Sequence, residues 1–571
     1  MRNTLLIISL IIPLFSFTQD QEKKFPKNDF IAPFAGDIEI IGTYCELRNN
    51  HFHGGLDIRT GGKIGRPVLS VADGYISRIN ISNNGYGKAL YITHKNGYTS
   101  VYAHLHEFPE WINWFIEKNQ YLQRRYELEI FPDADVLQVK QGELVAYSGN
   151  TGASQGPHLH FEIRETLSEA PVNPLLFGIK MRDVMAPAIL NLYLYAKDSM
   201  VKLHNGHYPS INLPLYTVTT IKKGKKKKKI NVPVSTHRMK YGTYALGANL
   251  KDFATSSGDN NGVNYIKVYK NGKLFYDCKI EKFMFSQMRM HNNYVDFKRD
   301  RTVGIRMHKL FIDDGNTLDF YDDSPENGWF TVNDTTPIKL KIVVSDVYGN
   351  QSEKTITIIG TPDGRSVTDY IVHKPQTKLF KANTDTKHDL YNELSLLIPA
   401  GSLYADYLVG YSRNSSNSFS IGDRLVPLDK KIDLIFRLEP HKIQFSNKYI
   451  VLASDGKKYG GELKGLDKLH FSVKEFGSYS LLLDTMPPNI KPIAFNKNSY
   501  FSFQLTDNLS GVKDFDFIIN GTWVLLQYDS KTGIASGRIP NPLSSGKHSI
   551  EMIVRDTRMN VRKYSRTIEI Q

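Results

Sequence analysis

The sequence predicts a mainly β protein: an antiparallel β domain with a helical insertion, followed by several β-sandwich modules. Aromatic residues make up 12% of the 571 residues, and flat aromatic rings fit the half-buried faces of pleated sheets. Short apolar runs alternate with Asn-Gly and Asp-Gly turn signals, which is typical of tight hairpins. The chain is also longer than one hydrophobic core usually allows, so we expect several domains.

Residues 1–18 match a secretory signal peptide. Arg2 gives a positive start, an apolar run extends from Thr4 to Phe17, and the sequence turns polar after Thr18. The run is shorter than the roughly 20 apolar residues that a membrane-spanning helix needs. We therefore expect cleavage after Thr18, export to the periplasm or the cell exterior, and no membrane span in the mature chain.

Residues 30–185 are predicted to form the first β domain, because four strand-like runs between 67 and 103 are separated by turn signals. Residues 107–137 break this rhythm and are predicted to be an inserted helical segment. Its apolar residues recur near helical spacing: Trp111, Trp114, Phe115, Tyr121 and Leu122. Two alternatives are open for this segment, which can pack on the β domain or cover its groove as a lid.

The remaining chain is predicted to divide into three β modules, at 186–360, 361–486 and 487–571, joined by linkers that contain Pro and Gly. Segments 345–350 and 555–560 look like one module ending used twice, a strand followed by an Asp-centred turn with Asn. This weak repeat suggests immunoglobulin-like sandwiches for the first and third of these modules.

Charge and cysteine content narrow the class of protein. Half of the net charge of +14 comes from one lysine run at 222–229, which is more typical of a solvated hairpin tip than of an anion-binding patch. We therefore expect no nucleic-acid partner. Cys45 and Cys278 are too few for a disulfide framework or a Cys-rich metal site. They are predicted to be free, mostly buried thiols in different domains, although pairing between them stays open.

Seven of the 17 histidines lie between positions 51 and 160. His53 and Asp57 are four residues apart around two glycines, whereas His158 and His160 alternate on a predicted strand and therefore point the same way. Zinc takes imidazole and carboxylate ligands, and a catalytic zinc site uses three protein ligands plus an open water position. His53, Asp57 and one of the two strand histidines would complete such a set.

Seven motifs in this region occur in a fixed order, at 53–57, 65–68, 72–74, 85–87, 102–105, 149–152 and 156–162. Together they closely resemble the lysostaphin/LytM-type zinc endopeptidases, which cut peptide cross-links in bacterial peptidoglycan. The resemblance covers about residues 36–170, roughly a quarter of the chain. It implies an antiparallel β fold of the duplicated-hybrid-motif type for this domain.

The resemblance also implies roles for single residues. His53, Asp57 and His160 would hold one Zn²⁺ per chain, and His104 and His158 would be the unliganded catalytic pair. One histidine of the pair would take a proton from water, and the other would donate to the oxyanion. Which of the two performs which step stays open.

Three further histidines lie close to these motifs. His51 and His106 are possible alternatives to the motif histidines two residues away, but the motif spacing favours the latter. His94 is predicted to be structural.

The function implied by the resemblance is that of an exported zinc metalloendopeptidase, hydrolysing peptidoglycan cross-links by a metal-activated water. A non-catalytic relative that binds peptidoglycan or activates another hydrolase is the alternative. Retention of every ligand and of both catalytic positions favours activity. Residues 186–571 contain no second ordered His/Asp constellation, so they are predicted to position the enzyme. The bond that is cut and any protein partners stay open.

Overall fold

The structure is a computed structural model that describes residues 25–180, 183–223, 226–253, 261–322, 324–495, 500–539 and 542–570. The predicted signal peptide at 1–18 lies outside the described residues, as do the side chains of the lysine run at 222–229. In the described part of the chain, no helix is long and apolar enough to cross a membrane. The predicted mainly β class is confirmed.

The N-terminal domain, residues 25–180, is built on one nine-stranded antiparallel sheet in the order β1-β4-β12-β8-β7-β6-β10, with β13 beside β12 and β9 beside β6. Strands β5 and β11 pair separately, and β2 and β3 form a hairpin. The bounds are β1 (Ile40–Gly42), β2 (Leu47–Arg48), β3 (His51–Phe52), β4 (Leu56–Arg59), β5 (Pro67–Leu69), β6 (Gly74–Ile81), β7 (Lys88–His94), β8 (Tyr98–Ala103), α2 (Glu110–Gln123), β9 (Leu128–Ile130), β10 (Gln138–Val139), β11 (Leu144–Tyr147), β12 (His158–Glu165), β13 (Pro171–Val172) and η1 (Pro174–Phe177).

Helix α2 confirms that the segment after β8 is helical. It ends at Arg124, which adopts the left-handed conformation. Ile112 and Ile116, one turn apart, are buried in the core of the domain. Trp114 is 62% exposed. The helix therefore packs on the β domain through its isoleucines, in agreement with the packing alternative.

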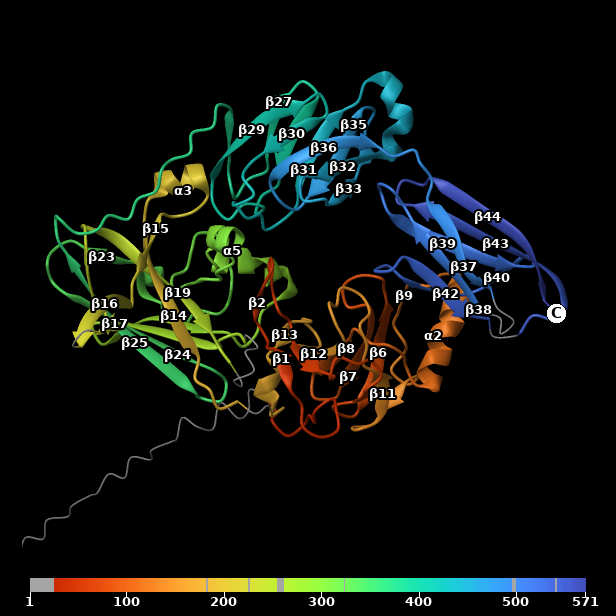
Figure 1. Cartoon of the computed structure of the whole chain (residues 1–571), viewed down its shortest axis with the longest axis horizontal. Helices are drawn as coiled ribbons and strands as arrows, with labels where there is room; N and C mark the ends of the chain where they lie inside the picture. The colour runs from red at the N-terminus through yellow and green to blue at the C-terminus, as the bar shows by residue number, and fades with distance from the viewer. Residues whose placement is uncertain are drawn as a thin grey trace, which may run out of the picture.

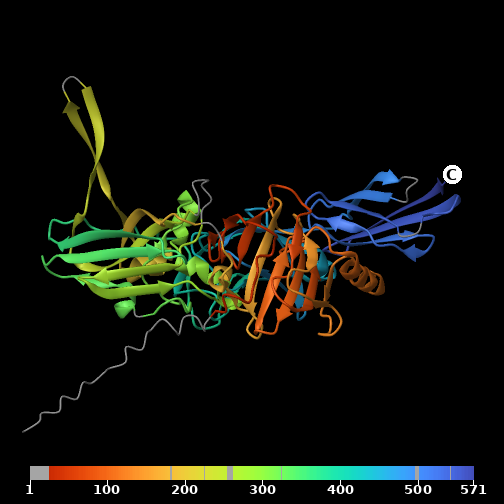
Figure 2. The same cartoon turned by 90° about the horizontal axis from the view of Figure 1, so that it is seen from below.

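The first sandwich, residues 183–360, encloses its core between two five-stranded sheets, one formed by β14, β15, β19, β22 and β23 and the other by β18, β20, β21, β24 and β25. Its elements are β14 (Ala188–Ala196), α3 (Ser199–Asn205), β15 (Ser210–Leu213), β16 (Tyr216–Lys223), β17 (Lys226–Pro233), β18 (Thr236–Met239), β19 (Gly242–Lys251), β20 (Tyr265–Lys270), β21 (Lys273–Lys279), η2 (Phe285–Met290), α4 (His291–Tyr294), α5 (Phe297–Val303), β22 (His308–Lys309), η3 (Pro325–Gly328), β23 (Phe330–Val332), β24 (Ile338–Ser345) and β25 (Gln351–Gly360). Figure 2 shows the β16–β17 hairpin projecting from this module.

The core of the first sandwich also contains residues of the N-terminal domain. Tyr44, Cys45, Leu47 and Phe52, on and beside the β2–β3 hairpin, belong to the same buried cluster as Cys278. Both cysteines are free and buried, as predicted. They do not occupy separate cores, however, because the hairpin carries Cys45 into the sandwich.

The third module, counted with the N-terminal domain as the first and the first sandwich as the second, consists of a six-stranded and a five-stranded sheet around one core. Its elements are β26 (Thr377–Phe380), β27 (Thr386–Tyr391), β28 (Leu394–Ile398), β29 (Tyr407–Ser415), β30 (Ser418–Ile421), β31 (Ile432–Arg437), η4 (Pro440–Lys448), β32 (Tyr449–Ala453), β33 (Lys458–Gly460), β34 (Glu462–Lys464), β35 (Lys468–Val473) and β36 (Gly477–Leu483).

The C-terminal module packs two four-stranded sheets around a smaller core. Its strands are β37 (Asn489–Phe495), β38 (Tyr500–Thr506), β39 (Val512–Ile519), β40 (Thr522–Trp523), β41 (Gln527–Asp529), β42 (Ile534–Arg538), β43 (Gly546–Asp556) and β44 (Val561–Ile570).

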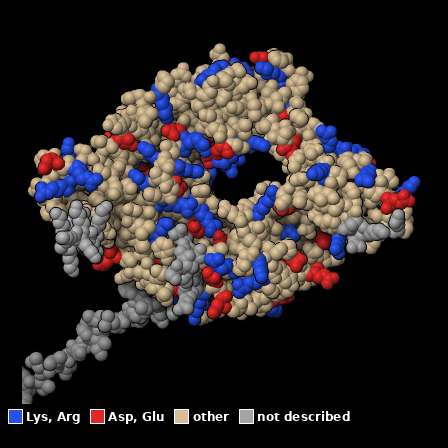
Figure 3. Space-filling view, in the orientation of Figure 1, with Lys and Arg blue, Asp and Glu red and all other residues tan. Residues whose placement is uncertain are grey.

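The four modules form a closed ring (Figure 1), and the space-filling view shows an opening at its centre (Figure 3). Polar contacts join successive modules. Arg289 donates to the carbonyl oxygen of Leu428 at 2.9 Å, and Lys448 donates to Asn560 Oδ1 at 2.6 Å. The ring closes where Lys531 of the C-terminal module donates to the carbonyl oxygen of Ser154 in the N-terminal domain, at 2.6 Å.

Candidate metal centre

Three predicted metal ligands meet at one point of the main sheet. Asp57 on β4 and His160 on β12 lie directly opposite each other in the antiparallel pairing, so their side chains share a face. His53 follows β3 and approaches from the side. His53 Nε2 lies 3.1 Å from Asp57 Oδ1 and 3.0 Å from His160 Nδ1, and the last two atoms are 2.9 Å apart.

Two glycines allow this approach. A Cβ atom at Gly55 would collide with the carbonyl oxygen of Phe161 on β12, and one at Gly54 would lie 3.2 Å from Glu162 Oε1. The segment between His53 and Asp57 can therefore lie flat against β12 only without side chains at these positions. The glycine-flanked spacing in the sequence has this steric cause.

The outer partners of the histidines fix which ring nitrogen carries the proton. His53 Nδ1 lies 2.8 Å from the carbonyl oxygen of Thr43, and His160 Nε2 lies 2.7 Å from Glu162 Oε1. These oxygens are acceptors, so the proton is on the outer nitrogen of each ring. In the neutral form of each ring, the lone pairs of His53 Nε2 and His160 Nδ1 therefore face Asp57 Oδ1.

This donor set fits zinc. Ligand atoms bonded to zinc at about 2.0 Å in a tetrahedron lie about 3.3 Å apart, close to the separations seen here. Two imidazole nitrogens and one carboxylate oxygen are ligands that zinc prefers, and a fourth position is left for water or substrate. Arg48 Nη2 donates to the outer oxygen, Asp57 Oδ2, at 2.5 Å and holds the carboxylate in place.

Burial and neighbouring charges shift the pKa values of these groups in different directions. Burial is the main cause that lowers the pKa of His53 to about 4. For His160, burial is outweighed by hydrogen bonds to Asp57 and Glu162, which raise its pKa to about 9. For Asp57, burial is outweighed by His53 and by hydrogen bonds from the histidines, so its pKa lies well below the usual value.

The two predicted catalytic histidines lie beside this cluster. Their rings are 4.9 Å apart, between centroids. His104 Nδ1 lies 2.9 Å from the carbonyl oxygen of Thr151, and His158 Nδ1 lies 2.8 Å from that of Gly156. Each ring therefore carries its proton on Nδ1 and has a lone pair on Nε2. His158 Nε2 is 3.4 Å from Asp57 Oδ1, so it faces the ligand cluster.

The other histidines of this region lie apart from the cluster. His94 is buried, with its two ring nitrogens 2.9 Å from the carbonyl oxygen of Asp73 and 2.8 Å from Ser100 Oγ, which fits the predicted structural role. His51 Nδ1 contacts the carbonyl oxygen of Asn49 at 2.8 Å, and His106 is exposed.

A buried charge network behind His160 was not predicted from the sequence. Glu162 is completely buried and accepts hydrogen bonds from Tyr86 Oη at 2.6 Å and from Arg164 Nε at 2.7 Å. His158, His160, Glu162 and Arg164 alternate along β12. Glu162 and Arg164 continue the two-residue alternation of His158 and His160. This pattern is the signal in the sequence that could have indicated the network.

The C-terminal module contacts the loop that holds the catalytic pair. Lys531 donates to the carbonyl oxygens of Asn150 at 2.7 Å and Ser154 at 2.6 Å. The same loop supplies the carbonyls of Thr151 and Gly156, which orient His104 and His158. The module at the end of the chain therefore supports the rim of the site.

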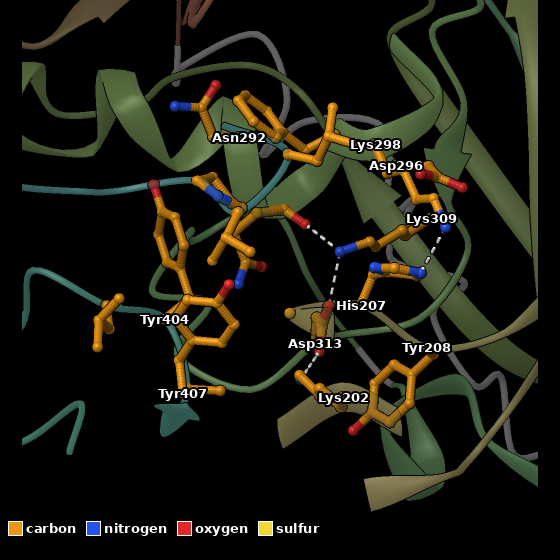
Figure 4. Close-up of a pocket in the computed structure, with 18 of the residues that line it drawn as sticks. Lys202, His207, Tyr208, Asn292, Asp296, Lys298, Lys309, Asp313, Tyr404 and Tyr407 are labelled. Carbon is orange, nitrogen blue, oxygen red and sulfur yellow. Dashed lines mark hydrogen bonds and ion pairs between the residues drawn. The ribbon is translucent and has the colours of Figure 1, made fainter. Parts of the chain in front are cut away.

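A pocket lined by charged and aromatic side chains lies between the first sandwich and the third module (Figure 4). Its cations are paired. Lys309 and Lys202 contact Asp313 at 2.6 and 2.5 Å, and Lys298 lies 3.1 Å from Asp369. This arrangement is an ion-pair network at a module interface, with its cations already neutralised by carboxylates.

Comparison with known proteins gives the family of the N-terminal domain. The model of peptidase family M23 matches residues 51–124 and 135–174, and that of a Zu5-like domain matches residues 377–484. The unmatched segment 125–134 is shorter than the predicted insertion at 107–137.

Curated relatives match a stretch of similar length. The DD-carboxypeptidase/endopeptidase Mpg of Neisseria meningitidis is 35% identical over 129 residues, which are 23% of each chain. The peptidoglycan DD-endopeptidase ShyB of Vibrio cholerae is 33% identical over 112 residues, 19% of this chain and 20% of that protein. The match therefore spans about a fifth to a quarter of the length of these relatives.

Among solved structures, the catalytic domain of lysostaphin from Staphylococcus simulans is 24% identical, with a TM-score of 0.18, and the match covers 24% of this chain and 87% of that one. The residues matched by the family model contain the His53, Asp57 and His160 cluster. The N-terminal domain of this chain is a peptidase family M23 domain of the LytM/lysostaphin type.

Proposed function

We propose that the protein is an exported zinc endopeptidase that hydrolyses peptide cross-links of bacterial peptidoglycan. The observation that carries the proposal is the convergence of three candidate ligand atoms, His53 Nε2, Asp57 Oδ1 and His160 Nδ1, beside the rings of His104 and His158. The name of the relative ShyB, a peptidoglycan DD-endopeptidase, supports peptidoglycan as the substrate, and the name of Mpg supports endopeptidase activity. The apolar run at 4–17 supports export.

His53, Asp57 and His160 would hold the zinc ion. When bound, zinc polarises a carbonyl group and lowers the pKa of a coordinated water toward 7. Thr43, Glu162 and Arg48 keep the three ligands oriented through the hydrogen bonds described above. Such outer partners typically change metal affinity about 10–100-fold when they are removed.

His104 and His158 would move the protons that peptide hydrolysis requires. The attacking water loses a proton, and the leaving amine gains one. Burial is the main cause that lowers the pKa of His104 to about 3, so its ring is neutral at neutral pH, and a proton taken up at Nε2 would be given up readily. The carbonyls of Thr151 and Gly156 keep Nδ1 protonated in both rings and aim Nε2 at the site.

Alanine substitutions test the assignment of roles. We expect His53→Ala, Asp57→Ala and His160→Ala to lose both zinc and activity, because two ligands make a weak site. His104→Ala and His158→Ala should keep zinc and lose about a hundredfold or more in rate. Zinc content by elemental analysis and the rate of muropeptide release by mass spectrometry check both groups.

His106→Ala and His51→Ala are matched controls, since each removes a histidine two positions away from a predicted site residue. Both should leave zinc content and rate unchanged. If His158→Ala emptied the metal site while His160→Ala left it filled, the ligand assignment within this pair would be reversed. A folded, zinc-loaded full-length chain that releases no muropeptide but binds sacculi would favour the non-catalytic alternative.

A further inference from the structure

Three carboxylates outside the proposed zinc site lie close together. Asp183 lies in the linker that leads into the first sandwich, Asp252 directly follows β19, and Asp346 directly follows β24. One oxygen from each lies within 4.8 Å of the others. Asp252 and Asp346 are each only 3% exposed.

Among the described residues, the charges that act on Asp252 are negative, and the backbone N–H of Phe253 is the group that opposes them. Burial is the largest influence on Asp252 and acts with the like charges of Asp183 and Asp346 to raise its pKa to about 7. Asp183 Oδ2 is also buried, and within the described residues it has no hydrogen-bond partner. Carboxylates that repel one another in a buried place are stable when a cation lies between them.

A buried amide side chain beside these carboxylates is a second indication of a ligand. Asn261 is 4% exposed, and neither its Oδ1 nor its Nδ2 has a hydrogen-bond partner in the described structure. Asn261 and Asp252 form an antiparallel bridge through two backbone hydrogen bonds of 2.9 and 3.2 Å. Residues opposed in this way project from the same face. The Asn261 amide therefore lies beside the Asp252 carboxylate, and its oxygen is available as a fourth ligand.

The C-terminal module repeats this arrangement. Asp484, Asp507 and Asp556 form a second cluster, and the linker sequence 183–187, Asp-Val-Met-Ala-Pro, corresponds to 484–488, Asp-Thr-Met-Pro-Pro. The hydrogen bonds of the hairpin aspartates also agree. Asn350 Nδ2 donates to Asp346 Oδ2 and Asn560 Nδ2 donates to Asp556 Oδ2, each at 2.7 Å.

The two clusters differ in their surroundings. In the C-terminal module, the Arg558 guanidinium interacts with the charges of Asp556 and Asp484, and Lys448 Nζ lies 2.6 Å from Asn560 Oδ1. A protein cation thus partly offsets the second cluster. At Asp252, the charges that act among the described residues are those of the other two carboxylates.

We propose that Asp183, Asp252, Asp346 and the amide oxygen of Asn261 bind a divalent cation, with Ca²⁺ as the fitting ion. The candidate ligands are all oxygens, which suit Ca²⁺ and Mg²⁺ rather than zinc. Ca²⁺ tolerates irregular sets of carboxylate and amide oxygens, whereas Mg²⁺ demands near-octahedral geometry and retains water. The bound ion would tie the linker to the first sandwich and so fix the module next to the peptidase domain.

The test uses the zinc-loaded full-length chain in Ca²⁺-free buffer. Calcium sites in extracellular modules have Kd values of about 10⁻⁴–10⁻³ M, so isothermal titration calorimetry and thermal unfolding should extend to about 10 mM CaCl₂. We expect one binding event and a rise in Tm of several degrees. Asp252→Asn and Asp346→Asn should abolish both, and Asn261→Ala should weaken binding about tenfold or more.

Asp507→Asn, at the corresponding position of the second cluster, is the matched control and should keep the response. The proposal is overturned if the folded wild-type chain shows neither binding nor stabilisation. It is also overturned if Asp252→Asn and Asn261→Ala both keep the wild-type response, or if only Asp507→Asn loses it. Should Asp252→Asn fail to fold, the Asn261→Ala titration decides.

Discussion

The peptidase domain contacts its neighbours in the ring through two very different surfaces. Toward the first sandwich it inserts the β2–β3 hairpin, with Tyr44 and Phe52 completely buried in the core of the sandwich. Toward the C-terminal module it presents the partly exposed ring of Tyr121, 5.5 Å from Trp523 between centroids, and the carbonyl oxygens that accept from Lys531. The first surface is apolar and enclosed, and the second is largely polar.

The hairpin contact resembles the interior of a single domain. The ring of Phe52 lies 5.4–5.7 Å from the rings of Phe283, His291, Tyr294 and Phe320, between centroids. Interiors of this kind are close-packed, and separation would expose large apolar side chains to water. The peptidase domain and the first sandwich therefore share one folding unit, although family boundaries divide them.

Because of this difference, the candidate active site lies between two unlike neighbours. The first sandwich is firmly attached through a shared core, whereas the C-terminal module can separate more easily. His53 directly follows Phe52, so the first proposed metal ligand is anchored by the core of the sandwich. His104 and His158 are held by the 149–158 loop, whose outer side contacts Lys531. Metal binding should thus depend strongly on the first sandwich, and only the catalytic pair should sense the C-terminal module.

Deleting modules should give the largest effect. A chain that ends at residue 180 exposes Tyr44, Leu47 and Phe52, so we expect it to aggregate or to bind little zinc. A chain that ends at residue 486 keeps the sandwich and should remain folded with one zinc ion. Soluble yield, zinc content and thermal unfolding of both chains measure the contrast. A folded, zinc-loaded 25–180 fragment would show that the hairpin is not needed in the sandwich core.

Single substitutions on the two surfaces should differ by a few kcal/mol. Phe52→Ala removes a buried ring and should lower the free energy of unfolding by about 3–5 kcal/mol. Tyr121→Ala loses one edge-to-face aromatic contact, which is worth about 0.5–1.5 kcal/mol beyond the area it buries. Chemical denaturation followed by tryptophan fluorescence measures both. Equal losses for the two variants would contradict the distinction between an enclosed and a polar surface.

Lys531→Ala should give the smallest effect. It removes hydrogen bonds to two backbone carbonyls at the edge of the module, with an expected loss of about 1 kcal/mol. Zinc content should stay at one per chain, and the peptidase rate should fall only a few-fold through added freedom of the 149–158 loop. Lys547→Ala, at an exposed position of β43, is the control. A loss of zinc in Lys531→Ala would show that this contact also supports the ligands.

Sequence reasoning found the centre of the site because its chemistry is local. Two glycines between His53 and Asp57, and the alternation of His158 and His160, are features that a strand and a close turn impose on neighbouring residues. Glu162 ends the 156–162 motif, and its role depends on the continued alternation and on complete burial, of which only the alternation is visible in the sequence. The family of this region is confirmed, and the roles of the individual residues stay predictions.

The arrangement of the modules could not be predicted in the same way. Cys45 and Cys278 are correctly predicted as free and buried, but nothing in their separation of more than 200 residues shows that one core holds both. The closure of the ring is equally impossible to predict from the sequence, because Lys531 binds backbone oxygens of Asn150 and Ser154. Backbone acceptors are present at every residue, so no side-chain pattern identifies them.

Ring closure has a consequence for the order in which the protein is made. The contact between Lys531 and Ser154 joins residues 377 positions apart. Synthesis runs from the N-terminus, so all three metal ligands leave the ribosome long before the residue that supports the loop of the catalytic pair. The active-site rim is completed only when the final module has been translated and folded. The contact therefore forms only on full-length chains, and truncated products lack it.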